Sequence, residues 1–314
     1  MGSHRPTQLC LEVARSVRER VAPELGMHRG RGHSGATAPE ARGEGGDITF
    51  AIDEWAEAHL EELLSDHAPA VAFYSEDRGL VSPGADPAWV LVVDPIDGTR
   101  PALAGLESAC VSVAAAPLHS DPAMGDVEVG CIVEIKSGTT FVAERGGGLS
   151  PAPSLSPNRE LSRMLWTYGL RGRPARPMAE VLGDLIDASS VGGASFDLGS
   201  ATFDMTRIAT GQLDAYVEPG PRIVADVPGM REEFERVGGG SVLNNSPYDL
   251  AAAVLCLLEA GAVVTDADGR PLDDRPLLGS GPDFQMSCVC ACNEELHAAI
   301  CAELDAGIER LLAG

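Results

Sequence analysis

The chain has 314 residues and a formal net charge of −24, which argues against nucleic acid as a partner because a phosphate backbone requires a basic binding face. With 44% hydrophobic residues it can build one large core or two medium ones, so it is not disordered. No apolar run has the length of a membrane span and no secretory signal is apparent, so we expect a cytoplasmic protein with no membrane partner.

Apolar residues at helical spacing predict a helix near residues 8–25 and an amphipathic helix at 53–67, whose outer face should carry Glu57. Residues 27–46 lie between them and are rich in Gly and Arg. They are expected to form a long mobile loop, of the kind that is usually either a functional lid or disordered. Short apolar, β-branched runs predict the strands of this half. We place them at 71–74, 89–93, 110–116, 127–134 and 139–143.

A boundary is expected near residues 146–160, where Gly146-Gly147-Gly148 precedes a Pro-rich stretch. Beyond it, runs of strand and helix length alternate, which is typical of an α/β fold. The expected strands are 163–168, 215–217, 262–265 and 286–291, and the expected helices are 178–187, 200–210, 249–259 and 294–312. We therefore predict an N-terminal α+β domain, residues 1–150, and a C-terminal α/β domain, residues 151–314.

Three of the eight cysteines, Cys288, Cys290 and Cys292, alternate along the last expected strand and would face one side together. A metal–thiolate site is one interpretation. However, no Cys-x-x-Cys pair or suitably spaced His accompanies them, and small buried thiols are common in such strands. We expect buried free thiols.

Two carboxylates, Asp94 and Asp97, follow the apolar run 89–93 on a turn where Pro95 and Gly98 end the strand. Anions this close repel each other unless a cation lies between them, so a metal site is favoured over a solvated acidic turn. A metal ion would also supply the positive charge that a strongly acidic protein needs to handle a phosphate group.

Four motifs in a fixed order carry a family resemblance. They are Ser75-Glu76-Asp77, Asp94-Pro-Ile-Asp-Gly-Thr99, Tyr248-Asp249 followed by Leu-Ala-Ala-Ala, and Glu259-Ala-Gly-Ala-Val-Val-Thr-Asp266. Together they resemble the inositol monophosphatase family of metal-dependent, lithium-sensitive phosphatases, over nearly the whole chain. The resemblance implies a layered αβαβα sandwich, a homodimer, and hydrolysis of a small polyol, sugar or inositol phosphate by metal-activated water.

The resemblance also implies two or three Mg²⁺ ions, which Mn²⁺ could replace. Glu76, Asp94 and the backbone carbonyl of Ile96 would hold the first ion. Asp94 would bridge to a second ion that Asp97 and Asp249 also hold. Two such ions typically lie about 3.5–4 Å apart and bind the attacking and leaving oxygens.

Water activation would fall to Thr99 paired with Asp47, although Thr99 could simply cap a helix and Asp47 could be a turn residue. The backbone N–H groups of Gly98 and Thr99 would bind phosphate at a helix start. Further substrate contacts are implied at Gly199, Ser200, Ala201 and Glu218. Ser200 could instead be a helix cap, and Glu218 a charge at a strand end.

One departure from the family pattern is an inserted stretch. Residues 221–247 separate Glu218 from Asp249, whereas the family places these two roles a few residues apart. Asp226, at the shorter spacing, is therefore a rival metal ligand, but we prefer Asp249 because of the motif that follows it. We expect the insertion to remodel the mouth of the pocket.

Other functions remain open. The substrate could be histidinol phosphate or a 3′(2′),5′-bisphosphate nucleotide, and the chain could be a relative that binds metal or metabolite without turnover. A haloacid-dehalogenase-like phosphatase fits poorly. Its two acids are two residues apart near the chain start, whereas Asp94 and Asp97 are three apart in the middle of the sequence.

Overall fold

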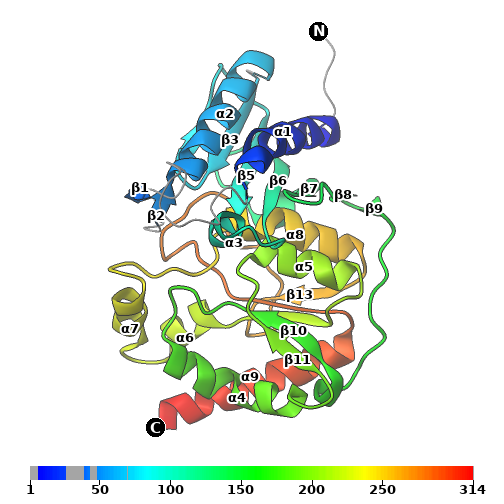
Figure 1. Cartoon of the computed structure of the whole chain (residues 1–314), viewed down its shortest axis with the longest axis vertical. Coiled ribbons are helices and arrows are strands. Elements are labelled where there is room, and N and C mark those ends of the chain that lie inside the picture. The colour runs from blue at the N-terminus through cyan, green and yellow to red at the C-terminus, as the bar shows by residue number, and fades with distance from the viewer. Residues whose placement is uncertain (1–5, 26–38, 43–47, 69, 314) are drawn as a thin grey trace.

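The computed structural model describes residues 6–25, 39–42, 48–68 and 70–313, and two main β-sheets organise them (Figure 1). The first sheet has seven strands in the order β4-β3-β5-β6-β7-β8-β9. They are β3 (Val71–Ser75), β4 (Gly79–Val81), β5 (Trp89–Asp97), β6 (Cys110–Pro117), β7 (Val129–Glu134), β8 (Thr140–Glu144) and β9 (Gly148–Ser150). β3 is parallel to β5, and the other neighbouring pairs are antiparallel.

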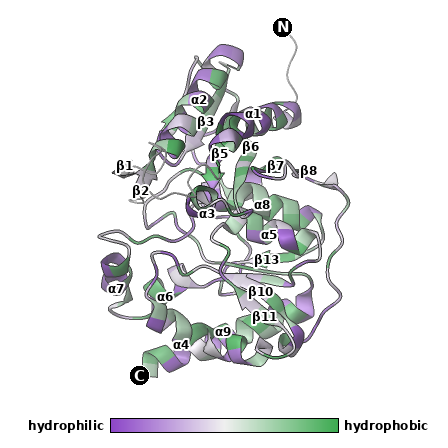
Figure 2. Cartoon of the chain, in the orientation of Figure 1, coloured by the Kyte–Doolittle hydropathy of each residue, from purple (hydrophilic) through white to green (hydrophobic). Residues whose placement is uncertain are grey.

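Helices cover both faces of this sheet, which is why β5 and β6 are apolar runs and not alternating patterns. α1 (Pro6–Val21) and α2 (Ala51–His67) pack on one face. α5 (Ala201–Ala209) and α8 (Pro247–Glu259) pack on the other. α8 is hydrophobic around most of its circumference, as its colour in Figure 2 indicates, because it is buried between two sheets.

The second sheet has five strands in the order β11-β10-β12-β14-β13. They are β10 (Leu165–Tyr168), β11 (Ala194–Phe196), β12 (Ala215–Glu218), β13 (Val263–Thr265) and β14 (Cys288–Ala291). β10 is parallel to β11 and β12, whereas β14 is antiparallel to both of its neighbours. α4 (Ala175–Ser189) and α9 (Glu294–Ala313) pack on each other and on its outer face.

From α1 and α2 to α4 and α9, helix and sheet layers therefore alternate, and Figure 1 shows the five layers from top to bottom. The layered αβαβα fold expected from the sequence is confirmed. One buried apolar cluster joins Ala72 and Val90 of the first half to Trp166 and Leu250 of the second. The division into domains at residue 150 stays a prediction.

The main strands and helices lie where the sequence predicts them, and the shorter elements were not predicted. Helix α1 ends at Val21, and a 3₁₀ turn, Ala22–Glu24, follows it. The elements not predicted are β1 (Pro39–Arg42), β2 (Ile48–Phe50), β4, β9, β11, α6 (Gly220–Asp226), α7 (Met230–Val237) and the 3₁₀ turns Met124–Asp126 and Leu161–Arg163. α3 (Thr99–Ala104) begins at the expected helix start, but Gly98 and not Thr99 is its N-cap residue. α6 and α7 occupy most of the inserted stretch.

Gly130 of β7 allows α8 to lie directly against the first sheet. A Cβ atom there would be 2.6 Å from the backbone oxygen of Ala252. We expect Gly130→Ala to lower the free energy of unfolding by about 1–3 kcal/mol, as overpacking does. Gly183→Ala in α4 is the matched control, because its Cβ would meet no atom within 4 Å. The control should be stabilised by about 0.5–1 kcal/mol. Equal urea midpoints for wild type and Gly130→Ala would contradict the close packing.

The eight cysteines are free, and Cys288, Cys290 and Cys292 are buried as expected. The Sγ atoms of Cys288 and Cys290 lie 3.5 Å apart. Within the described residues, the only group of side chains arranged to hold a metal ion consists of aspartates, so the metal–thiolate interpretation has no support. In the same residues we find no helix with the length and apolar character needed to cross a bilayer.

Candidate active site

A β-bulge at the end of β5 brings Asp94 and Asp97 to the same face of the sheet. Residues three apart in a regular strand point to opposite faces. Here Asp94 pairs with Ser112 and Asp97 with Cys110, so one extra residue is inserted between them. Bulges often re-aim side chains in this way next to functional sites.

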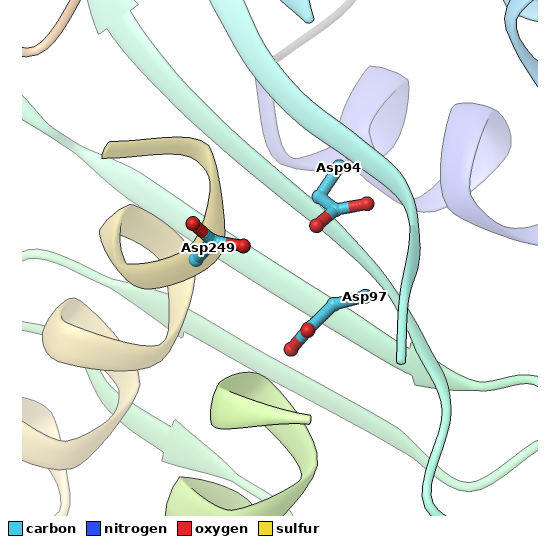
Figure 3. Close-up of side chains that lie close together, drawn as sticks. All are labelled: Asp94, Asp97 and Asp249. Carbon is cyan, nitrogen blue, oxygen red and sulfur yellow. The ribbon is translucent and has the colours of Figure 1, made fainter. Parts of the chain in front are cut away.

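Asp249 completes the cluster from the first turn of α8. Its Oδ2 accepts a hydrogen bond from the backbone N–H of Ser246 at 2.6 Å, which caps the helix and fixes the carboxylate. The carboxylates of Asp94, Asp97 and Asp249 face a common space in Figure 3, with one oxygen of each within 4.8 Å of the others. The structure therefore brings together three of the predicted metal ligands from two distant parts of the chain.

One oxygen of each aspartate in β5 accepts hydrogen bonds from the protein. Asp94 Oδ1 accepts from the N–H of Ile96 at 2.9 Å. Asp97 Oδ2 accepts from the Ser200 hydroxyl at 2.8 Å and from the N–H of Thr202 at 2.6 Å, at the start of α5. These bonds leave one oxygen of each aspartate directed at the shared space. Such a set of hard, pre-oriented oxygens suits Mg²⁺.

Burial raises the pKa values of all three aspartates, and repulsion from neighbouring carboxylates adds to it for Asp94 and Asp249. Burial is the main cause for Asp94, and the charges of Asp97, Asp249 and Glu76 add to it. Burial also raises the pKa of Asp97, against hydrogen bonds from Thr202 and Ser200. Burial and then the charge of Asp97 raise the pKa of Asp249 to about 7. A divalent cation would relieve this repulsion, so the donor set fits a metal.

Asp226 does not belong to this cluster. It lies at the end of α6, where its Oδ2 is 3.3 Å from Arg222 Nε. The geometry therefore favours Asp249 over the rival ligand.

Glu76 lines the same cleft. The chain segment around Glu76 is held in place by the buried carboxylate of Glu57. Glu57 is 1% exposed, although helical spacing placed it on the outer face of α2. Its Oε2 accepts from the Ser75 hydroxyl at 2.6 Å, and its Oε1 accepts from the N–H of Asp77 at 3.3 Å. The residues on both sides of Glu76 are thus fixed to α2.

This carboxylate should make stability depend on pH. Burial raises the pKa of Glu57 from 4.5 to about 7, despite the hydrogen bonds from Ser75 and Asp77. The folded state therefore binds this proton more tightly than the unfolded state, and stability falls as the pH rises from about 4.5 to 7. In metal-free protein, Glu57→Gln should reduce this fall by about 3 kcal/mol. The control is Glu62→Gln, an exposed position on the same helix, which should keep the wild-type dependence of stability on pH. If Glu57→Gln also kept the wild-type dependence, the raised pKa would not belong to Glu57.

The hydroxyl of Thr99 lies 2.9 Å from Asp53 Oδ1 and 3.1 Å from the Ile96 carbonyl oxygen. Asp53 is itself fixed, because its Oδ2 accepts from the N–H of Phe50 at 2.8 Å. Sequence reasoning missed Asp53, which it treated only as the start of a helix. Asp47, the expected partner, lies outside the described residues.

The expected substrate-binding residues divide into two groups. Gly98, Thr99 and Gly199 line the cleft. Gly98 adopts a φ of +93°, and a Cβ there would be 2.5 Å from the Ser108 carbonyl oxygen, so only glycine fits. Ser200 and Ala201 are buried and are not among the residues that line the cleft. The Ser200 hydroxyl caps α5 and donates to Asp97, which confirms the helix-cap interpretation.

Glu218 is fully buried at the end of β12 and is absent from the cleft wall. It forms an ion pair with Arg173, and its Oε1 accepts from the N–H of Gly220 at 2.9 Å. A carboxylate with these partners cannot reach a substrate in this conformation. The expectation that Glu218 binds a substrate hydroxyl is therefore not supported.

The insertion supplies Leu243, Asn244 and Ser246 to the cleft. The remodelling of the pocket mouth relative to other family members stays a prediction. Arg171 also lines the cleft, and its charge helps to lower the pKa values of Asp97 and Asp249. The cleft thus combines an acidic floor with cationic and amide side chains around it.

The sequence model of the inositol monophosphatase family matches residues 8–309. The chain belongs to this family. It is 29% identical over 275 residues to the fructose-1,6-bisphosphatase/inositol-1-monophosphatase of Methanothermobacter thermautotrophicus, covering 84% of this chain and 85% of that protein. It is 26% identical to the inositol-1-monophosphatase of Mesorhizobium japonicum, covering 81% and 85% of the two chains.

The fold agrees with this membership. The solved structure of a Thermotoga maritima IMPase superposes with a TM-score of 0.67 at 19% identity, covering 96% of this chain and 98% of that one. The family resemblance and the fold predicted from sequence are confirmed, and the chain is by class a phosphoric monoester hydrolase.

Proposed function

We propose that this chain is a Mg²⁺-dependent phosphomonoesterase acting on a small polyol, sugar or related phosphate ester. The observation that carries the proposal is the convergence of Asp94, Asp97 and Asp249 in one cleft. The cleft also contains Glu76 and Thr99. Phosphomonoester hydrolysis needs the charge of the phosphate neutralised and a water oriented in line with the leaving oxygen.

Glu76, Asp94, the Ile96 carbonyl, Asp97 and Asp249 would hold two Mg²⁺ ions, with a third weaker ion near Glu76; Mn²⁺ could replace them. When bound, the ions would neutralise phosphate charge and lower the pKa of water. The number and identity of the ions are part of the proposal.

The protein groups would orient the reactants. The Thr99 hydroxyl donates to Asp53, so its lone pairs remain available to accept a hydrogen bond from the attacking water. Asp53 is then a positioning residue that acts through Thr99. The backbone N–H groups of Gly98 and Thr99 would donate to phosphate oxygens. Arg171 would supply a further positive charge at the cleft wall.

Phosphate release from a panel of esters, with Mg²⁺ and with EDTA, tests the proposal. The panel should contain inositol, histidinol and sugar phosphates, fructose 1,6-bisphosphate and adenosine 3′,5′-bisphosphate. We expect Mg²⁺-dependent release from at least one ester, and we further expect a cytoplasmic homodimer. Absence of release from the whole panel would favour a relative that binds metal without turnover. Release that persists in EDTA would contradict metal dependence.

A further inference from the structure

The turn that carries Glu76 joins β3 to β4, and side chains of α2 hold it. Glu57 of α2 accepts hydrogen bonds from the residues on both sides of Glu76, as described above. The last residue of the turn, Arg78, forms ion pairs with Glu54 and Glu61 of the same helix at 2.6 and 3.3 Å. The backbone around this proposed ligand is therefore fixed at several points.

The position of this turn decides how closely Glu76 can approach an ion. Glu76 lines the cleft, but its carboxylate is not part of the group whose oxygens lie within 4.8 Å of one another, which consists of Asp94, Asp97 and Asp249. A displacement of the turn would therefore change whether Glu76 can share an ion with Asp94. Partners that hold a metal ligand in place typically contribute roughly 10–100-fold to metal affinity.

Thr49 of β2 holds the turn from a different element. Its Oγ1 donates a hydrogen bond to Asp77 Oδ1 at 2.8 Å, and the residue is 6% exposed. A hydrogen bond to a carboxylate is stronger than one between neutral groups, and a β-branched side chain has few accessible rotamers. The hydroxyl is therefore a well-oriented donor that fixes the carboxylate next to Glu76.

A donor to Asp77 is valuable because two other carboxylates lie close to it. Glu76 is its neighbour in the chain, and Glu57 accepts a hydrogen bond from its backbone N–H. Burial is the main cause of the raised pKa of Glu57, and the charge of Asp77 adds to it. Asp77 itself is not among the residues that line the cleft. Its effect on an ion would therefore pass through the backbone of the turn.

The same strand also contacts the pair that would orient the attacking water. β2 runs directly into α2 (Figure 1), and the N–H of Phe50 donates to Asp53 Oδ2 at 2.8 Å. The other oxygen of Asp53 accepts from the Thr99 hydroxyl. The centroid of the Phe50 ring lies 5.4 Å from Cζ of Arg100, which lines the cleft. Two neighbouring residues of β2 thus contact two different parts of the site.

We propose that Thr49 is a positioning residue for the metal site, and that it acts through Asp77 on the turn that carries Glu76. The inference rests on the proposed function, because it takes Glu76 to be a metal ligand. It gives separate roles to two neighbouring residues of β2. The side chain of Thr49 supports metal binding, and the backbone of Phe50 supports the orientation of water.

Calorimetric titration of metal-free protein with Mn²⁺ tests the inference without turnover. Thr49→Val keeps the shape of the side chain and removes the donor, so we expect it to weaken the binding of at least one Mn²⁺ ion about tenfold. Thr49→Ser keeps the hydroxyl and should bind nearly as the wild type does. Asp77→Ala should lose as much affinity as Thr49→Val. The double variant should lose little more, because both changes remove the same hydrogen bond.

The matched control is Thr140→Val, which makes the same change in a strand of the first sheet. The Thr140 hydroxyl donates to the carbonyl oxygen of Gly138, two residues before it, at 3.2 Å. Neither residue lines the cleft. This variant should therefore bind Mn²⁺ as the wild type does.

Kinetics should separate the roles of Thr49 and Asp53. Thr49→Val should raise the Mg²⁺ concentration needed for half-maximal activity about tenfold. Its kcat at saturating Mg²⁺ should change little, because the bond from the Phe50 N–H to Asp53 is left intact. Asp53→Asn should instead lower kcat at every Mg²⁺ concentration.

The unfolding midpoint in EDTA separates positioning from stability. Loss of a buried hydrogen bond should lower the midpoint of Thr49→Val whatever the role of the residue. A residue that only stabilised the fold would show this lower midpoint together with the Mn²⁺ affinity of the wild type, and that result would overturn the inference.

An equal loss of Mn²⁺ affinity in Thr49→Val and Thr49→Ser would also overturn it, since the hydroxyl would then not be the cause. Mg²⁺-dependent phosphate release by the wild type would still support the proposed function in these cases. If the wild type released no phosphate from any ester, and Thr49→Val still weakened Mn²⁺ binding, the result would count against the proposed function and support the inference.

Discussion

Asp94→Asn is expected to lower kcat roughly a thousandfold while the protein remains folded. Asp94 Oδ1 accepts from the N–H of Ile96, and an amide oxygen can preserve that bond. The change removes the charge that would lie between two cations. It also removes one of three buried, mutually repelling anions, so metal-free Asp94→Asn should be at least as stable as the wild type.

Measurements of kcat with Mg²⁺ and of the unfolding midpoint in EDTA together check this result. Asp249→Asn should lose activity similarly, because its carboxylate belongs to the same cluster. The control is Asp184→Asn in α4, where the carboxylate is exposed and 2.7 Å from Arg310 Nη1, on the outer helix layer. An Asp94→Asn or Asp249→Asn enzyme with near-normal kcat would contradict the metal assignment.

Asp53→Asn is expected to lower kcat about a hundredfold or more, with a smaller change in KM. The carboxylate accepts the hydrogen bond of Thr99, so its loss lets the hydroxyl turn away from the attacking water. Thr99→Val, which keeps the shape and removes the hydroxyl, should show a loss of the same order. The double variant should lose little more than either single one, because both act through one hydrogen bond.

Asp47→Asn distinguishes the two candidate partners. A loss of kcat at Asp47 that exceeded the loss at Asp53 would restore the expectation drawn from sequence and contradict the pairing seen in the structure. Rates for all variants should be compared across pH, because a residue needed only for folding would lower activity without changing the shape of the pH profile.

The parts of the site that could be predicted from sequence are those encoded locally. An apolar run followed by Asp94-Pro-Ile-Asp-Gly fixes a strand, its end and two carboxylates within ten residues, and the bulge in β5 is compatible with that spacing. Asp249 was found because it begins a helix whose alanines pack between two sheets.

The residues that sequence reasoning missed or misplaced have one physical cause in common. Each of them interacts with a partner that is distant in the chain. Thr99 and Asp53 are separated by 46 residues, so no local pattern pairs them. Helical spacing placed Glu57 in solvent because periodicity does not show that Ser75 and Asp77 would satisfy a buried carboxylate. Glu218 was expected in the pocket, but Arg173 neutralises it inside the protein. Buried charges depend on such tertiary partners.

The central claim is that Asp94, Asp97 and Asp249 bind divalent cations, and anomalous diffraction from Mn²⁺-soaked crystals tests it most directly. We expect anomalous peaks in the cleft at about 2.1 Å from carboxylate oxygens of these three residues. Well-occupied manganese elsewhere on the molecule, with no peak among the three aspartates, would contradict the account.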